Sequence, residues 1–303
     1  MAHFRLPVEA PDLMRRARAR VGTMLRGKWH LDSILGTGGM ATVYEATHRN
    51  GTRGAIKVLH PELALRSDIV DRFVREGYHA NKVGHSGAVR IIDDDVDQDG
   101  TVYLVMELLC GETLEGRRER KGGRLDLDDV LCIVERVLGV LKRAHEHGVV
   151  HCDLKPENLY VTDSGIIKVL DFGMAGLLES APSIRGIPAG TPSFMPPEQA
   201  HGKWDEVDAR TDIWALGATM FTLLTGTYLR NAQTWQEQLW DAATQPVASL
   251  AETGLDFPPQ VIRLVDKALL MEPHHRWQDA DSMRMALRDT WTRLHSPALA
   301  VTG

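Results

Sequence analysis

The chain has 303 residues, of which 43% are apolar, so it can bury a large core and is neither a small disulfide-bonded scaffold nor a disordered chain. Its 35 Lys and Arg against 41 Asp and Glu give a formal net charge of −6, which is too near neutral for a general polyanion binder. The three cysteines, none in CxxC spacing, argue for a reducing compartment and against a zinc site. We therefore expect a cytoplasmic protein that binds no nucleic acid.

Residues 1–28 form a basic N-terminal extension. Six positive charges and no acid fall between Leu13 and Lys28. No stretch of the chain approaches the roughly 18 apolar residues that a membrane span needs, and the early arginines leave no segment typical of a signal peptide. We expect no membrane span, and we expect the extension to be a solvated lead-in to the first strand rather than a docking arm for an anionic surface.

Residues 29–109 predict a small lobe rich in strands. Runs of β-branched and aromatic residues predict strands at 29–35, 42–47, 53–59, 88–92 and 101–107. One helix, at 67–83, places Phe73, Gly77 and Ala80 on a single face that can pack against the sheet.

Residues 110–295 predict a larger, mainly helical lobe, and residues 296–303 a tail. Apolar periodicity predicts helices at 127–147, 208–224, 234–243, 259–270 and 280–294. Two short strands, at 159–162 and 166–170, flank an Asp-x-Gly turn. The expected class is therefore α+β, with a small antiparallel sheet plus one helix in the first lobe and mainly helices in the second.

The sequence GTGGMATV at positions 36–43 is rich in glycine, which lets backbone amides approach phosphate oxygens closely. It also fits the dinucleotide-binding fingerprint, with Ala41 in the last position. That fingerprint must open a helix, whereas 42–47 alternates like a strand, so the nicotinamide interpretation is set aside. A plain hairpin turn stays open as the alternative for these glycines.

Three other patterns are weaker. Residues 22–28 read GxxxxGK, but Trp29 stands where a Ser or Thr hydroxyl should bind magnesium. Residues 95–100 open like a calcium loop, but the twelfth position is Met106, so an acidic hairpin turn is the better interpretation. The histidines and cysteine at 145–152 suggest a metal, but two of them belong to a stronger motif.

A series of motifs in fixed order is far more specific than any one of them. AIK at 55–57 lies on the third predicted strand, and Glu76 follows Lys57 by 19 residues on the predicted helix. HCDLKPEN then occupies positions 151–158, and DFG occupies positions 171–173. A strand Lys or an Asp before Gly is by itself usually an edge or turn residue. Together, in this order and spacing, the motifs match the signature set of protein kinases.

The chain resembles the catalytic domain of eukaryotic-like Ser/Thr protein kinases, the Hanks-type kinases of bacteria, over positions 29–294. Later landmarks agree, namely GTP at 190–192, PPE at 196–198, DIW at 212–214 with Gly217, and Arg276. The resemblance implies the two-lobed kinase fold and an ion pair between Glu198 and Arg276. Lys155 in the sequence DLKPEN is typical of the Ser/Thr rather than the tyrosine subclass.

By this resemblance the catalytic residues are Asp153, Lys155, Lys57 and Glu76. Asp153 would accept the proton of the substrate hydroxyl, and Lys155 would steady the transferring phosphate. Lys57, held by Glu76, would bind the α and β phosphates of ATP. The implied reaction is transfer of the γ-phosphate of ATP to a protein hydroxyl.

The resemblance also implies the residues that hold the cofactors. Asn158 and Asp171 would bind the Mg²⁺ ions. Met106 would line the back of the adenine pocket, while Glu107 and Leu109 would offer backbone hydrogen bonds to the base. The full set implied for the nucleotide is Gly36, Gly38, Gly39, Val43, Ala55, Lys57, Met106, Glu107, Leu109 and Tyr160.

The chain departs from the family pattern at four positions. Cys152 stands where most relatives carry an Arg that pairs with a phosphate on the activation segment, so we expect activity without phosphorylation of that segment. A small buried filler is preferred over a redox-sensitive thiol for Cys152. Ala41 replaces the third glycine, Pro196 replaces an Ala, and Tyr160 stands where an aliphatic floor for adenine is usual.

The segment at 171–198 carries four hydroxyl residues. If it is autophosphorylated, we expect Ser180 and Ser183 to be the sites. Thr191 is instead expected to bond Asp153 and Lys155.

Two other functions fit part of the pattern. A pseudokinase scaffold, binding nucleotide or partners without turnover, is disfavoured because every catalytic residue named above is present. A small-molecule phosphotransferase is disfavoured by the peptide-docking elements at 191–198. The expected partner is a protein with a Ser or Thr acceptor, and dimerisation of relatives through the small lobe leaves a weak homodimer open.

Overall fold

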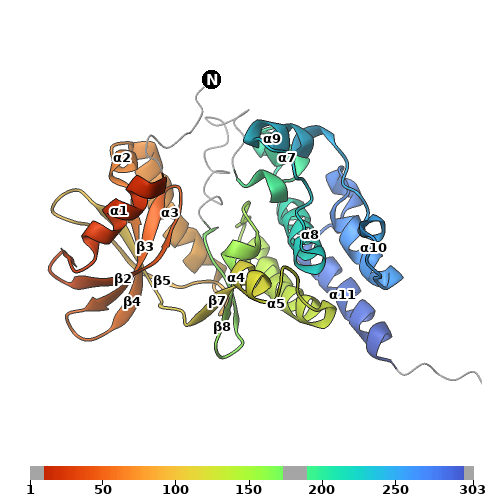
Figure 1. Cartoon of the computed structure of the whole chain (residues 1–303), viewed down its shortest axis with the longest axis horizontal. Coiled ribbons are helices and arrows are strands. Elements are labelled where there is room, and N and C mark those ends of the chain that lie inside the picture. The colour runs from red at the N-terminus through yellow and green to blue at the C-terminus, as the bar shows by residue number, and fades with distance from the viewer. Residues whose placement is uncertain (1–9, 173–189, 297–303) are drawn as a thin grey trace, which may run out of the picture. The chain divides into compact units, whose positions relative to one another are not determined.

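The computed structural model describes residues 10–172 and 190–296 (Figure 1). Its contacts divide the chain into a first unit, Met1–Asn81 with Val89–Cys110, and a second unit, Lys82–Ala88 with Gly111–Gly303. The first unit is built mainly on a sheet, and the second mainly on helices, as the α+β expectation requires.

The first unit contains a six-stranded antiparallel sheet with the strand order β1-β2-β3-β4-β6-β5. Its strands are β1 (Met24–Leu25), β2 (Trp29–Thr37), β3 (Ala41–His48), β4 (Arg53–Leu59), β5 (Ile91–Val96) and β6 (Val102–Met106). Helices α1 (Ala10–Arg20), α2 (Pro61–Ala64) and α3 (Ser67–Val83) complete it. The helix predicted at 67–83 is confirmed with the same bounds.

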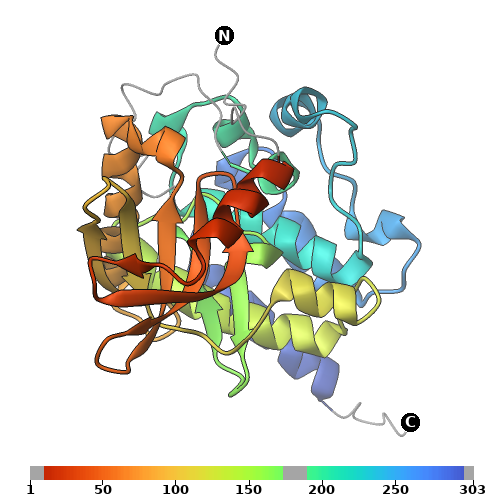
Figure 2. The ribbon, with the colours of Figure 1, turned by 60° about the vertical axis from the view of Figure 1, so that its left-hand side comes forward.

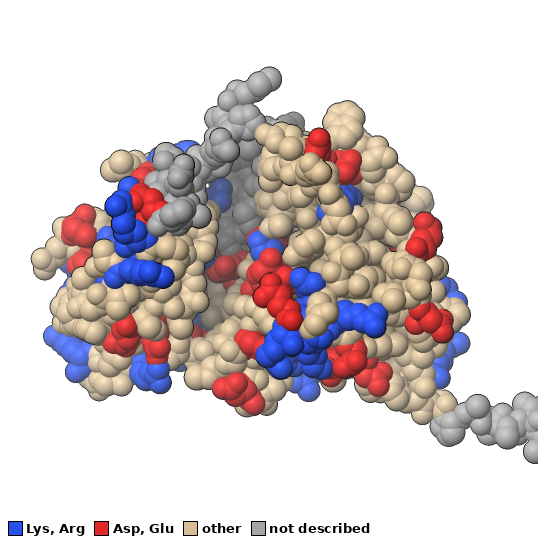
Figure 3. Space-filling view, in the orientation of Figure 1, with Lys and Arg blue, Asp and Glu red and all other residues tan. Residues whose placement is uncertain are grey.

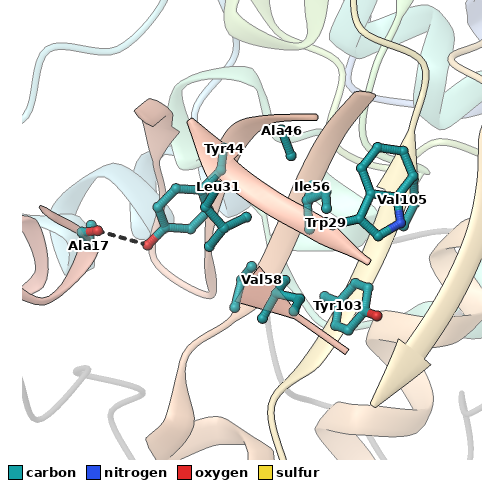
Figure 4. Packing of buried hydrophobic residues seen from close by; sticks show 10 residues of the cluster. Ala17, Trp29, Leu31, Tyr44, Ala46, Ile56, Val58, Tyr103 and Val105 are labelled. Carbon is teal, nitrogen blue, oxygen red and sulfur yellow. Dashed lines mark hydrogen bonds between the residues drawn. The ribbon is translucent and has the colours of Figure 1, made fainter. Parts of the chain in front are cut away.

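One face of this sheet carries an apolar core. Alternate residues of the central strands, Tyr44, Ile56, Val58, Tyr103 and Val105, are buried together there (Figure 4). Because side chains alternate between the faces of a strand, their neighbours along the strands lie on the opposite face. That opposite face therefore holds the lysine of β4, which sets the position of the candidate site.

The basic N-terminal segment contains a packed helix, which the expectation of a solvated lead-in did not include, although most of its arginines are exposed. It forms α1, whose Ala17 is 3% exposed and accepts a hydrogen bond at its carbonyl from the Tyr44 hydroxyl at 3.2 Å (Figure 4). Arg16 pairs with Glu62 of α2, and Arg20 lies 3.7 Å from Asp99. Asp12 of the same helix also pairs with Arg15 and Arg16, so acids both near and far along the sequence neutralise this basic run.

The strand predicted at 88–92 is displaced along the chain. β5 instead covers Ile91–Val96, with Asp95 paired to Tyr103 of β6. The edge position of β5 explains the difference, because Asp93 and Asp94 are exposed there while the backbone pairs on one side. Ala88 forms a parallel bridge with Val169 in the second unit.

The second unit is mainly helical and includes a small sheet. Its strands, in the order β7-β8-β9, are β7 (Gly111–Thr113), β8 (Leu159–Thr162) and β9 (Ile167–Val169), and the last two form the predicted hairpin. Its principal helices are α4 (Leu114–Arg120), α5 (Leu127–Glu146), α7 (Pro197–Ala200), α8 (Ala209–Thr225), α9 (Trp235–Thr244), α10 (Pro259–Ala268) and α11 (Ala280–His295) (Figures 1 and 2). Among the described helices, none combines the length and the apolar character needed to cross a membrane.

Helix α8 is the centre of the second unit. Every residue from Thr211 to Leu224 is buried, and α5, α10 and α11 pack against the helix. Asp208 begins it with a capping box, which satisfies backbone amides of the first turn. Gly226 ends it at a φ of 82°, where a Cβ would lie 2.9 Å from the Gly123 carbonyl oxygen, so glycine is required there.

Basic and acidic side chains lie next to each other on the face of the second unit shown in Figure 3. Near α4, Arg117 and Arg120 lie 2.9 and 2.6 Å from the Glu112 carboxylate. The hydrogen bond from Arg120, with help from Arg117, lowers the pKa of Glu112 to about 2. The basic side chains at 117, 118, 120 and 121 are thus each paired with a nearby acid.

Candidate active site

In the first unit the structure brings Lys57 and Glu76 together. Lys57 Nζ on β4 donates to Glu76 Oε1 on α3 at 2.6 Å, and both side chains are largely buried. The ammonium also lies 5.9 Å from the centroid of the Phe73 ring. An ion pair this buried is held in one geometry by its surroundings, so the lysine charge has a defined position.

Three residues expected at the nucleotide lie on the same face of the sheet as Lys57. Val43 of β3 pairs directly with Lys57, and Ala55 of β4 pairs with Met106 of β6. Ala55 and Met106 are 6% and 8% exposed. Together they form an apolar surface beside the lysine, which suits the flat ring of a nucleobase.

The glycine-rich segment is a turn between β2 and β3, followed by a strand and not by a helix. This observation excludes the dinucleotide-binding motif. At Gly36 no heavy atom lies within 4 Å of where a Cβ would be, so the backbone is open to a ligand. His60, which the sequence did not single out, supports the turn, since its Nε2 lies 2.9 Å from the Gly38 carbonyl oxygen and its amide donates to the Met40 carbonyl.

In the second unit a loop between α5 and β8 carries a compact polar cluster. Asp153 Oδ2 lies 3.0 Å from Lys155 Nζ, and Asp153 Oδ1 accepts from the Thr191 hydroxyl at 3.1 Å and from its amide at 3.2 Å. Lys155 Nζ donates to the Thr191 hydroxyl at 2.7 Å. The predicted role of Thr191 is thus confirmed. Asp153 and Lys155 are each 19% exposed, so their side chains remain open to a substrate.

Buried polar groups hold this loop in an unusual conformation. Cys152 has a φ of 66°, in the left-handed region that is rare for residues other than glycine. Asp212 of α8 compensates, because its two carboxylate oxygens accept the amides of His151 and Cys152, each at 2.9 Å. Gln199 donates to the Cys152 carbonyl at 2.7 Å. Strain at the residue before Asp153 is therefore imposed by the second unit itself.

The tautomer of His151 follows from its two contacts. Nε2 lies 2.7 Å from the Leu170 carbonyl oxygen and donates to it, while Nδ1 accepts the amide of Asp153 at 3.2 Å. The ring also packs against Phe172, with centroids 4.8 Å apart. His151 thereby links the Asp153 loop to the strand end that precedes Asp171.

Two pKa shifts bear on the chemistry of this loop. Burial would raise the pKa of Asp212, but the hydrogen bond and charge of His145, together with His151, lower it below its ordinary value. Burial, and then the charges of Asp212, Asp153 and Glu198, raise the pKa of the Cys152 thiol well above its ordinary value. Cys152 is 3% exposed, and this burial favours a small apolar filler over a redox-sensitive thiol.

The residues expected at the metal offer suitable oxygen atoms. Asn158 donates its amide nitrogen to the Asp153 carbonyl at 2.8 Å, which leaves the amide oxygen as the acceptor. Asp171 supplies a carboxylate and has a φ of 54°, so it too lies in the left-handed region. Amide and carboxylate oxygens are the hard ligands that Mg²⁺ prefers, so this donor set fits Mg²⁺.

A buried ion pair fixes the segment that follows the site. Arg276 donates to both oxygens of Glu198 at 2.8 and 2.9 Å, and the two residues are 1% and 4% exposed. Thr211 adds a hydrogen bond to Glu198 at 2.9 Å. The predicted pair is confirmed.

The remaining predicted residues are placed as follows. Glu107 donates its amide to the Arg90 carbonyl at 3.0 Å and accepts the Arg90 amide on its side chain at 2.7 Å. Leu109 follows β6 in the first unit, and Tyr160 lies on β8, paired with Lys168. Gly173, Ser180 and Ser183 lie outside the described residues.

A paired lysine on a sheet face, and a loop that presents an aspartate, a lysine and an asparagine, are the parts of a phosphotransferase. The chain matches the protein kinase domain family model over residues 29–292. It is 37% identical over 269 residues to the serine/threonine-protein kinase PksC of Streptomyces coelicolor, covering 85% of this chain and 48% of that protein. It is 32% identical over 265 residues to PknA of Mycobacterium tuberculosis, covering 86% of this chain and 60% of that protein.

Among solved structures, the PknI kinase domain of Mycobacterium tuberculosis has a TM-score of 0.70 and 25% identity, covering 89% of this chain and 98% of that one. These matches show that the chain belongs to the protein kinase domain family and has the two-lobed kinase fold. It spans about half the length of the curated relatives.

Proposed function

We propose that the chain is an active Ser/Thr protein kinase that transfers the γ-phosphate of Mg-ATP to Ser or Thr hydroxyls of a protein. The observation that carries the proposal is the Asp153, Lys155 and Thr191 cluster, in which a carboxylate and an ammonium lie 3.0 Å apart and both stay partly exposed. A carboxylate placed in this way can accept the hydroxyl proton, and an ammonium beside it can stabilise the charge of the transferring phosphate.

The other residues have supporting roles in the proposal. Lys57, oriented by Glu76, binds the α and β phosphates. The open turn at 36–41 covers the phosphates with backbone amides, and Val43, Ala55 and Met106 contact the base. Because the Glu107 amide already donates to the Arg90 carbonyl, Glu107 contacts the adenine base through its own carbonyl oxygen.

Mg²⁺, when bound, neutralises phosphate charge and orients the γ-phosphate. Asn158 and Asp171 would hold it through oxygen atoms. Asn158 also donates to the backbone of Asp153, so the residue that binds the metal is coupled to the residue that accepts the proton.

We further propose that activity does not require a phosphate on the activation segment. The residue before Asp153 is a buried thiol, which carries no positive charge for a phosphate, and its conformation is held by Asp212 and Gln199. The double variant Ser180→Ala with Ser183→Ala is expected to keep the activity of the wild type. A large loss in this variant, restored by acidic replacements, would contradict the proposal.

The test of the main proposal compares phosphate transfer from radiolabelled ATP to a generic protein acceptor by the wild type and by Asp171→Asn. We expect transfer to Ser and Thr by the wild type and almost none by the variant. Equal label in both would refute the enzymatic function. Nucleotide binding without any transfer by the wild type would support the pseudokinase scaffold instead.

A further inference from the structure

Arg230 is a buried cation whose guanidinium is poorly satisfied. It lies in the segment that joins α8 to α9 and is 6% exposed. Its Nε and Nη2 atoms are buried and have no hydrogen-bond partner, and Arg230 forms no ion pair within the described residues. Buried arginines are normally paired with carboxylates. An unpaired buried guanidinium destabilises the fold unless a ligand binds its free donors.

Among the described residues, the surroundings of Arg230 attract the cation but place no carboxylate within ion-pair distance of it. Its guanidinium carbon lies 5.6 Å from the ring centroid of Trp214, and Nη1 makes a long contact of 3.4 Å with the Met195 carbonyl oxygen. Trp214 is itself fully buried, and its Nε1 also has no partner. Burial lowers the pKa of Arg230 to about 10, against the opposing charge of Asp241, so the group is still cationic at neutral pH.

The contrast with Arg276 is informative. Arg276 lies 4.9 Å from the centroid of the same Trp214 ring, but it binds both oxygens of Glu198 and three backbone carbonyls. The fold can therefore satisfy a guanidinium completely beside this ring. At Arg230 the fold buries the cation but leaves Nε and Nη2 without an acceptor among the described residues. These two donors can therefore bind an anion that comes from another molecule.

The place of Arg230 indicates where such an anion comes from. Its contact, Met195, ends the short segment that begins at Thr191, and Thr191 bonds Asp153 and Lys155. Met195 also packs with Ala242 of α9 in an apolar cluster that supports this segment. In the proposed reaction the acceptor hydroxyl lies at Asp153, so a peptide lying along 191–195 carries its next residues toward Arg230.

We propose that Arg230 is a specificity-determining residue that binds the carboxylate of an Asp or Glu located a few residues from the acceptor Ser or Thr in the substrate. This inference rests on the proposed kinase function and extends it to a substrate class, acidic peptides. A carboxylate is a stronger acceptor than the Met195 carbonyl and can accept from the guanidinium at two points, so it displaces the long contact as the segment adjusts to the peptide.

The test uses a peptide with one Ser, in which Asp or its uncharged analogue Asn is placed at each position from four residues before the Ser to four after it. For the wild type we expect kcat/KM to be about tenfold higher for Asp than for Asn at one or two positions, equivalent to about 1.4 kcal/mol. In Arg230→Met the ratio is expected to fall to about one. Arg230→Lys keeps the positive charge, so its Asp-to-Asn ratio of kcat/KM is expected to lie between those of the wild type and Arg230→Met.

Arg263→Met, at an exposed arginine of α10, is the matched control and is expected to keep the full ratio. A stability measurement shows that the Arg230→Met protein folds, and we expect its Tm to rise because a buried unpaired charge is replaced by an apolar side chain of similar length. A wild-type ratio near one at every position, or a ratio that persists in Arg230→Met, would overturn the proposal.

A binding measurement separates this proposal from the kinase function itself. Fluorescence polarisation of the same labelled peptides with Asp153→Asn reports the preference without any phosphate transfer. Absence of transfer to every peptide by the wild type would refute the kinase function, whereas transfer without an acidic preference would refute only the role of Arg230. Preferential binding of the Asp peptides that is lost in Asp153→Asn combined with Arg230→Met supports that role.

Discussion

At the scale of single residues, the conformation of the loop between α5 and β8 depends on one buried carboxylate. Asp212 is 0% exposed and accepts hydrogen bonds from the amides of His151 and Cys152 and from the His145 ring, at 2.9, 2.9 and 2.8 Å. These bonds hold the left-handed backbone at Cys152 and hence the direction of Asp153. Asp153, the proposed general base, is thus positioned by a buried carboxylate that lies behind its backbone.

We predict that Asp212→Asn lowers the free energy of unfolding by about 3 kcal/mol, because it removes the charge of a buried, hydrogen-bonded pair. Chemical denaturation checks the value, and Asp205→Asn, at an exposed acid of the same unit, is the control. A loss no larger than in the control would contradict the role given to Asp212.

The same residue predicts a dependence on pH. Its pKa is lower in the folded state than in the unfolded state, so its contribution is complete above the ordinary carboxyl pKa and is lost as the pH falls through the folded value. The stability difference between wild type and Asp212→Asn is therefore expected to be constant near neutral pH and to shrink in acid below about pH 4. A difference that grows on acidification would contradict the direction of the shift.

The cysteines give a chemical check on burial. Cys110 and Cys132 are exposed, whereas Cys152 is buried with a raised pKa. Iodoacetamide is expected to alkylate the first two in the native protein and to reach Cys152 only after unfolding. Mass spectrometry of the digested protein measures this order. Early modification of Cys152 would restore the redox interpretation.

At the scale of elements, α1 is part of the first unit although the family match begins after it. Ala17 packs against the sheet, while Ala19 on the same helix is exposed. We predict that Ala17→Glu lowers the unfolding free energy by roughly 2 kcal/mol or more, because a charge is forced against an apolar core. The matched variant Ala19→Glu is expected to change it by less than about 0.5 kcal/mol, and equal losses would show that α1 is not packed as described.

The elements also show what sequence patterns can and cannot predict. Helix α3 and the hairpin of β8 and β9 were predictable, because periodicity and a turn motif are local signals. Helix α1 and the position of β5 were not, because they depend on acids and apolar side chains from distant parts of the chain. Arginine-rich and aspartate-rich runs look solvated until their tertiary partners are known.

The residues of the candidate site also differ in whether the sequence predicts them. Lys57, Glu76, Asp153 and the Glu198 pair were predictable from ordered motifs, and the structure confirms their contacts within each unit. His60, Gln199 and Arg230 carry no motif, and their roles arise only from tertiary contacts. Sequence reasoning therefore finds the reactive groups better than the groups that position them.

At the scale of the whole molecule, the proposed catalytic residues are divided between the two units. In the proposed function, Lys57 in the first unit would bind phosphates, and Asp153 in the second unit would accept a proton. Variants of Lys57 and Asp153 are therefore expected to differ in nucleotide binding. Lys57→Met should weaken nucleotide binding and transfer, while Lys82→Met, at an exposed lysine near the end of α3, should change neither.

The most direct test measures nucleotide binding and single-turnover transfer of the γ-phosphate, with Mg²⁺, in the same preparations of wild type and Asp153→Asn. We predict that both proteins bind ATP, that the wild type forms phosphoserine or phosphothreonine on a protein acceptor, and that the variant is slower by at least about 100-fold because its general base is gone. Binding by both proteins with no transfer by the wild type, or equal transfer by both, would contradict the account.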